Sequence, residues 1–168
     1  MDGNLSELLA AREERALVQR VFLGAAGASF VVQISLNIPG LPKRLKGDEQ
    51  AVIRAREIFL SEYKVLPSAE ARMVNFAGVS SVILFAGGGA ASAKRTAVAV
   101  EDGAEWGRIL DIDVITGAGP VPRTSLGFSG RKCMLCGETA KICARERGHP
   151  VATLREEASR LLRLVRSG

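Results

Sequence analysis

The chain of 168 residues is 47% hydrophobic and 24% charged, as expected for a single globular domain over residues 1–168. Its net charge of +5 lies at the end, because residues 1–130 hold 14 basic and 14 acidic side chains and residues 131–168 hold 9 and 4. A basic end favours an anionic partner, but aromatic residues are only 5% and no run interleaves them with Lys or Arg, which argues against nucleic acid. The start, MDGNLSELLAAREER, has no apolar signal core, so we expect a cytoplasmic protein.

The first 67 residues predict a helix, a strand and a second helix. Asn4 followed by Glu7 fits a capping box before the helix LLAAREERALVQRVFL, which is expected to end near Gly24. The β-rich stretch ASFVVQISLNIPG predicts a strand that stops at its Pro-Gly turn. Asp48 is expected to cap the second helix, EQAVIRAREIFLSEY, which must end before Pro67.

Residues 68–130 predict three strands and a loop. Residues 73–93 are uncharged over a length that would span a bilayer, but Gly, Ala and Ser dominate them, so we expect one buried strand over 79–85 and no membrane segment. The following Gly87–Gly89 is interpreted as a plain turn, with a phosphate-binding loop as the alternative. The segments RTAVAVE and ILDIDVIT predict two more strands, and GAGPVPRTSLGFSG a loop.

The end of the chain predicts a Cys/His-rich segment over 131–150, with a helix over 138–147, and a last helix over 151–166. An apolar stripe on the last helix consists of Leu154, Ala158, Leu161, Leu162 and Val165. Helices that interrupt strands indicate the α+β class, with a mixed β-sheet, flanking helices and a Cys-rich helical segment at the C-terminus.

Two aspartates interrupt the apolar run GRILDIDVITG. On a strand, Asp111 and Asp113 share one face, while Leu110, Ile112 and Val114 share the other. Two adjacent carboxylates suit Mg²⁺, which substrate phosphates usually complete in phosphoryl transfer. Glu101 could supply a third acid, and Lys94, Arg95 and Arg108 lie near enough in sequence to meet phosphate. The alternative is a half-exposed strand whose acids face water.

All three cysteines and the only histidine fall within one short segment, CMLCGETAKICARERGH. Cys133, Cys136, Cys143 and His149 could close a tetrahedral structural zinc site, in which Cys-x-x-Cys-Gly forms a tight turn. The alternative is that the cysteines are small core residues.

These two motifs together resemble the apo-citrate lyase phosphoribosyl-dephospho-CoA transferases, also called holo-citrate lyase acyl carrier protein synthases. The matching positions near the C-terminus are Gly107, Arg108, Asp111, Asp113, Val114, Arg131, Cys133, Cys136, Cys143, Ala144, Arg145 and His149. Supporting matches upstream are Arg12, Glu13, Arg15, Gln19, the turn in LNIPGLPK, Lys43, Lys94 and Glu101. The DIDV strand is also similar to that of the nucleotidyltransferase superfold.

The resemblance implies a nucleotidyltransferase-type reaction. Such enzymes move phosphoribosyl-dephospho-CoA from triphosphoribosyl-dephospho-CoA to a serine of the citrate lyase acyl carrier subunit, and pyrophosphate leaves. It implies Asp111 and Asp113 as Mg²⁺ ligands, with Glu101 as a third acid. The implied phosphate-binding residues are Arg108, Lys94, Gly107, Arg12 and Arg15. The basic C-terminal part is expected to meet the carrier protein, since acyl carrier proteins are usually acidic.

The chain departs from the family pattern at one place and leaves rival interpretations open. Many relatives carry His-Pro-Leu before Gly-Arg, where this chain has Ala104-Glu105-Trp106. One rival is a related nucleotidyltransferase that modifies another carrier protein. The other is a non-catalytic zinc-knuckle adaptor for an acidic partner.

Overall fold

The structure is a computed structural model that describes residues 2–165. In chain order the helices and strands are α1 (Asp2–Leu23), β1 (Phe30–Leu36), α2 (Asp48–Tyr63), β2 (Ala69–Asn75), β3 (Gly78–Phe85), α3 (Ala90–Asp102), the 3-10 helix η1 (Glu105–Ile109), β4 (Leu110–Thr116), β5 (Gly119–Pro120), the 3-10 helix η2 (Arg123–Leu126), α4 (Ala140–Arg145) and α5 (Val151–Leu164). The predicted α+β class with flanking helices is confirmed.

The five strands form one sheet in the order β2-β3-β1-β4-β5. We expected a mixed sheet, whereas all the described pairings are antiparallel. The central strand β1 pairs with β3 on one side and β4 on the other, so that Gln33 lies opposite Asp113 and Ser35 opposite Asp111. This register brings polar residues of β1 beside the two aspartates of β4.

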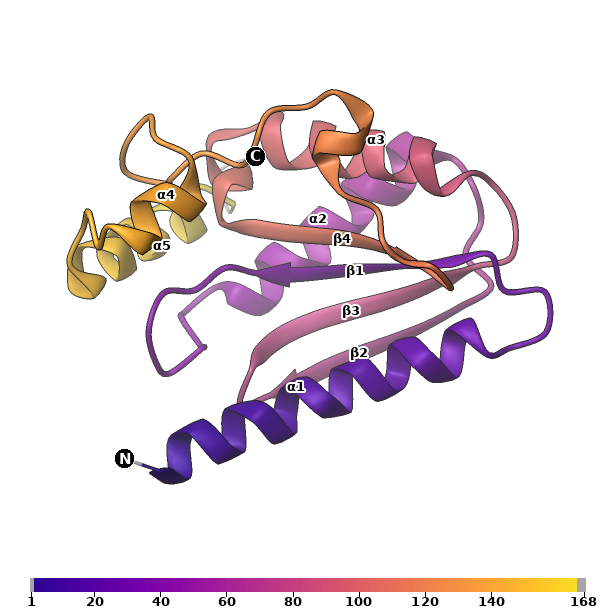
Figure 1. The fold of residues 1–168 in the computed structure, drawn as a ribbon, viewed down its shortest axis with the longest axis horizontal. Helices are drawn as coiled ribbons and strands as arrows, with labels where there is room; N and C mark the ends of the chain where they lie inside the picture. Colours follow the sequence, from indigo (N-terminus) through magenta and orange to yellow (C-terminus); the bar gives the residue numbers. More distant parts are fainter. Residues whose placement is uncertain (1, 166–168) are drawn as a thin grey trace.

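Helices cover the sheet on both faces (Figure 1). Helices α2 and α3 pack on one face, where Phe59 and Ala97 meet Ile34, Ile83 and other buried side chains. On the other face α1 lies along β2, β3 and β1. Because both of its faces are covered, six of the seven residues of β1 are buried, including the polar Gln33 and Ser35.

The C-terminal helix closes one end of the molecule. In Figure 1, α4 and α5 lie at the end of the sheet where β1 finishes and β4 begins. Leu161 and Leu162 of the predicted stripe are buried against Ile38 and Ile109 in a second apolar cluster. The helix is confirmed over Val151–Leu164, and its expected end at residue 166 lies outside the described residues.

The expected strand RTAVAVE is wrong, because these residues belong to α3. Val98, Val100 and Thr96 favour a strand locally, but the buried positions Ala93, Ala97 and Val100 recur at helical spacing. Helix packing therefore overrides β-propensity here, and it places Glu101 on a helix.

Three smaller expectations also differ from the structure. Helix α1 begins at Asp2, so the capping box at Asn4 is not the helix start. Gly47 is the N-cap of α2, and Asp48 occupies the first turn. Strand β2 was missed, although its residues alternate between half-buried and exposed as a strand requires. No helix in residues 2–165 is long and apolar enough to cross a membrane, and the uncharged stretch 73–93 runs from β2 through β3 into α3.

Candidate functional site

Strand β4 presents its two aspartates on the face that it shares with α1. As predicted, Leu110, Ile112 and Val114 are fully buried on the opposite face, while Asp111 and Asp113 are half-buried. Burial raises the pKa of Asp113, and the neighbouring Asp111 carboxylate raises it further. Among the described residues, no donor is within hydrogen-bond distance of the Asp113 carboxylate. The face therefore carries negative charge that the surrounding protein compensates only in part.

Two buried polar residues of β1 extend this face, and sequence reasoning missed both. Gln33 is 7% exposed and Ser35 is 3% exposed, and they lie opposite Asp113 and Asp111 in the register. Gln33 also accepts a hydrogen bond from Gln19 of α1. The signal was present in FVVQISL, where polar residues recur two apart, as in LDIDV.

Helix α1 supplies two arginines above the aspartates. Arg12, Arg15 and Asp111 line a hollow of about 310 Å³ between α1, β1 and the following loop. Arg15 Nη2 donates to the carbonyl oxygen of Ala77 at 3.1 Å, whereas its buried Nε has no hydrogen-bond partner. Burial lowers the pKa of Arg15, and Asp111 opposes this shift. The structure thus brings the N-terminal arginines and Asp111 to one hollow.

The outer edge of β4 is held by two buried side chains of α3. Lys94 Nζ donates to the carbonyl oxygen of Ile112 at 2.7 Å, and Glu101 Oε1 accepts from the N–H of Ile112 at 2.8 Å. Lys94 is 5% exposed and Glu101 4% exposed, and Glu101 lines a hollow together with Arg123 and Arg131. Their contacts with the backbone of Ile112 hold β4 at the position between the two aspartates.

Arg131 connects this edge to the aspartates, although it lies in the Cys-rich segment. Its Nη2 donates to Glu101 Oε1 at 2.6 Å and to Asp111 Oδ1 at 2.9 Å. Arg123 Nη1 approaches Glu101 Oε2 at 3.7 Å. Burial raises the pKa of Glu101, and Arg131 opposes this shift most strongly. Glu101 therefore anchors Arg131, which in turn reaches Asp111.

The two residues of the Gly-Arg pair before β4 have different environments, since Gly107 is buried and Arg108 is exposed. Gly107 is buried, and a Cβ there would lie 2.4 Å from the carbonyl oxygen of Glu101. Arg108 is exposed and lines two neighbouring hollows. Glu105, at the position that departs from the family pattern, pairs with Arg160 of α5 at 2.6 Å. Gly107 is thus required by close packing, while Arg108 is available to a ligand.

The cysteines and the histidine converge as the spacing predicted. The ligand atoms of Cys133, Cys136, Cys143 and His149 all lie within 4.8 Å of one another. Cys143 Sγ lies 3.5 Å from Cys133 Sγ and 4.0 Å from Cys136 Sγ. Tetrahedral Zn–S bonds of about 2.3 Å place sulfurs about 3.8 Å apart.

The electrostatics of this cluster also fit a cation. The buried Nε2 of His149 has no hydrogen-bond partner. A hydrogen bond with Cys133 and burial raise the pKa of Cys143 to about 12. Burial raises the pKa of Cys133, but backbone N–H groups of Leu135 and Cys136 outweigh it and lower the pKa overall. The four side chains can hold a metal ion such as zinc.

Comparison with known proteins places the chain in one family. The family model described as apo-citrate lyase phosphoribosyl-dephospho-CoA transferase matches residues 3–164. A probable apo-citrate lyase phosphoribosyl-dephospho-CoA transferase from Streptococcus pyogenes serotype M18 is 32% identical, over 94% of this chain and 84% of that protein. The Escherichia coli apo-citrate lyase phosphoribosyl-dephospho-CoA transferase is 26% identical, over 95% of this chain and 88% of that protein. Protein CitXG of Leuconostoc mesenteroides is 27% identical over 95% of this chain, which spans 35% of that protein. The chain therefore belongs to the apo-citrate lyase phosphoribosyl-dephospho-CoA transferase family.

Proposed function

We propose that the protein transfers phosphoribosyl-dephospho-CoA from triphosphoribosyl-dephospho-CoA to a serine of the citrate lyase acyl carrier subunit. The observation that carries the proposal is the pair of aspartates on the open face of β4, flanked by Arg15 and Arg131. The family to which the chain belongs supports the choice of substrate and acceptor.

The proposed reaction is a displacement at phosphorus. The serine oxygen attacks the phosphate nearest the ribose, an O–P bond forms, and the bond to the departing pyrophosphate breaks as the hydroxyl loses its proton. Arg12 and Arg15 lie above the acidic face, where they can hold the anionic phosphates. Arg131 orients Asp111, and Glu101 orients Arg131. In this proposal Lys94 and Glu101 act through the backbone of Ile112 as positioning residues.

The residues suited to Mg²⁺ are Asp111 and Asp113. Among the described residues, no hydrogen-bond donor contacts the Asp113 carboxylate. Its pKa is raised by burial and by Asp111, so the surrounding protein compensates its negative charge only in part. When bound, the ion would neutralise charge on the phosphates and on the departing pyrophosphate. Glu101 is unsuited as a third ligand, because Ile112, Arg131 and Arg123 already face its oxygens.

The Cys/His cluster suits a structural zinc ion. Cys133, Cys136, Cys143 and His149 fill all positions of a tetrahedral ion and leave no open position for catalysis. Arg131 lies two residues before Cys133, so zinc in this proposal stabilises the segment that delivers Arg131 to Asp111.

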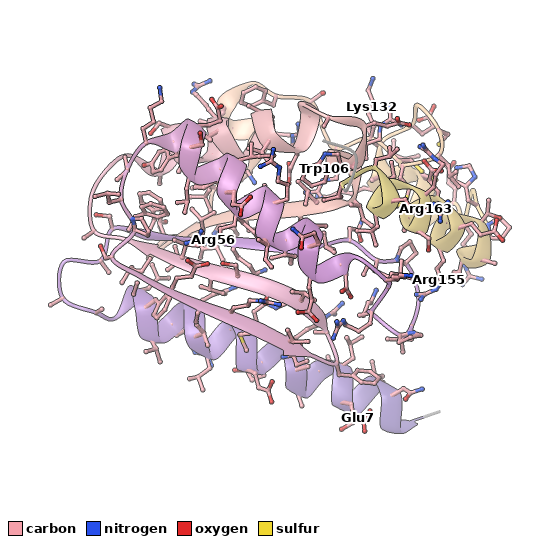
Figure 2. The ribbon with its side chains drawn as sticks, turned by 180° about the vertical axis from the view of Figure 1, so that it is seen from behind. Glu7, Arg56, Trp106, Lys132, Arg155 and Arg163 are labelled. Carbon is pink, nitrogen blue, oxygen red and sulfur yellow. The ribbon has the colours of Figure 1, made fainter. Side chains whose placement is uncertain are left out.

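The acceptor is proposed to dock at the basic C-terminal end. Arg155 and Arg163 both lie at this end of the molecule (Figure 2). An acidic carrier protein would be attracted there, and its association would weaken as salt rises.

The direct test is the intact mass of an apo citrate lyase acyl carrier subunit after incubation with this protein, precursor and Mg²⁺. A gain equal to one phosphoribosyl-dephospho-CoA group, with release of pyrophosphate, supports the proposal. No gain while the precursor still binds would indicate another carrier as acceptor. No gain and no precursor binding would favour the adaptor interpretation.

A further inference from the structure

A second, larger hollow lies beside the aspartate face. It has a volume of about 710 Å³, which includes the space beside Cys133, Cys143 and His149 of the metal cluster, and we call it the C-terminal groove. The loop after β1 contributes Ile38 and Pro39 to one part of its lining. The Cys/His segment and α5 contribute Met134, Val151 and Leu154. These residues give the groove an apolar surface.

Cations also line the C-terminal groove. They are Lys43, Arg108, Arg131, Lys132 and Arg147. Within residues 2–165, no acidic side chain lines the groove, and Arg108, Lys132 and Arg147 form no ion pair. Burial lowers the pKa of Lys43, and the positive charges of Arg12 and Arg155 lower it further. Arg131 is paired with Glu101 and Asp111, whereas Arg108, Lys132 and Arg147 have no anion within the described residues to balance them.

The groove adjoins the aspartate face through shared residues. Arg131 lines the groove and also donates to Asp111 at 2.9 Å. Ile38 and Lys43 line both the groove and the hollow beneath Arg12 and Arg15. A single extended ligand can therefore place one part at the aspartates and another in the groove.

We infer that the C-terminal groove binds the dephospho-CoA half of the substrate, with the diphosphate on its cations and the pantetheine arm on its apolar surface. The inference rests on the proposed function for the identity of the ligand. A diphosphate joined to a weakly polar arm matches a lining that combines unpaired cations with apolar side chains. The triphosphate then remains at the aspartate face, where the metal ligands are.

The test uses dephospho-CoA alone as the probe, in calorimetric titrations of the purified protein with its metal content measured. Lys132→Glu and Arg147→Glu are each expected to weaken binding at least tenfold, because charge-assisted hydrogen bonds to phosphate contribute roughly 1.5–3 kcal/mol. Lys141→Glu is the matched control, since Lys141 is an exposed α4 residue that does not line the groove. It should change the affinity less than twofold.

A comparison with ADP separates the two parts of the inference, which are the diphosphate on the cations and the pantetheine arm on the apolar surface. Dephospho-CoA should bind more tightly than ADP, which has the diphosphate but no pantetheine arm. Equal affinities of dephospho-CoA and ADP, or equal effects of the three Glu variants on dephospho-CoA binding, would overturn the assignment.

The proposed function can fail separately. If transfer to the carrier occurs but the groove variants bind dephospho-CoA normally, the groove assignment is wrong and the proposed function stands. If dephospho-CoA binds as expected and no group is transferred to any carrier, the groove stands and the proposed function fails.

Discussion

Replacing Asp113 by Asn should stabilise the folded protein while it removes the cation site. Asp111 and Asp113 lie two residues apart on β4, which corresponds to about 7 Å between them. At an effective dielectric constant of about 20, two negative charges at this distance repel by about 2.4 kcal/mol. Arg131, Lys94 and Arg15 offset part of this repulsion. We therefore expect a net gain in the free energy of unfolding on the order of 1 kcal/mol without Mg²⁺.

The assay is thermal unfolding of the wild type and the variant, with and without millimolar Mg²⁺. A gain of about 1 kcal/mol raises the unfolding midpoint of a chain of this size by about 2–4 °C. Mg²⁺ at ten times its dissociation constant should add about 1.4 kcal/mol to the wild type and little to the variant. Glu62→Gln is the control, because Glu62 is an exposed α2 residue and the charge change is the same. A fall of several degrees in Asp113→Asn, or an equal response of both proteins to Mg²⁺, would refute the reasoning.

Four further outcomes follow from the contacts around the site. Because burial raises the pKa of Asp113, its folded form takes up a proton at higher pH than its unfolded form. Ionisation of Asp113 therefore lowers the free energy of unfolding as pH rises through that range. Conversely, the rise in unfolding midpoint that Mg²⁺ causes should become smaller as pH is lowered from 8 towards about 4, as measured by thermal unfolding. Cys143→Ser should lower the zinc content of the purified protein, found by elemental analysis, and its unfolding midpoint; unchanged zinc would rule out the cluster. Gly107→Ala should lower the free energy of unfolding by about 1–3 kcal/mol in a denaturant titration, because the added Cβ would clash with the carbonyl oxygen of Glu101. An unchanged free energy of unfolding would contradict the close packing at this position. Lys94→Met should lower the free energy of unfolding by a similar amount, roughly 1–3 kcal/mol, because the buried carbonyl oxygen of Ile112 is left without a donor. An unchanged free energy of unfolding would show that a water molecule takes the place of the lysine as donor.

Local periodicity predicted much of the fold. The alternation in LDIDV correctly placed Leu110 and Ile112 in the core and both aspartates on the opposite face. The apolar stripe of α5 likewise identified Leu161 as buried. The same reasoning failed for α3, because β-branched residues that favour a strand in isolation are accommodated where the helix packs on the sheet.

The spacing of Cys and His predicted their convergence, whereas the contacts between distant segments were beyond local reasoning. Arg131 was noted only as a motif position, yet it reaches Glu101, thirty residues earlier, and Asp111, twenty residues earlier. Arg123 lay in an expected loop and approaches the same glutamate. Such pairs depend on the tertiary path of the chain, which no periodic pattern encodes.

The most direct test of the central claim is a single-turnover transfer assay that compares Asp113→Asn with Glu62→Gln. Both variants remove one negative charge, but only Asp113 lies on the acidic face of β4. The intact mass of the acyl carrier subunit should increase by one phosphoribosyl-dephospho-CoA group with Glu62→Gln and remain unchanged with Asp113→Asn. Full transfer by a folded Asp113→Asn protein would contradict the claim that this face performs the reaction.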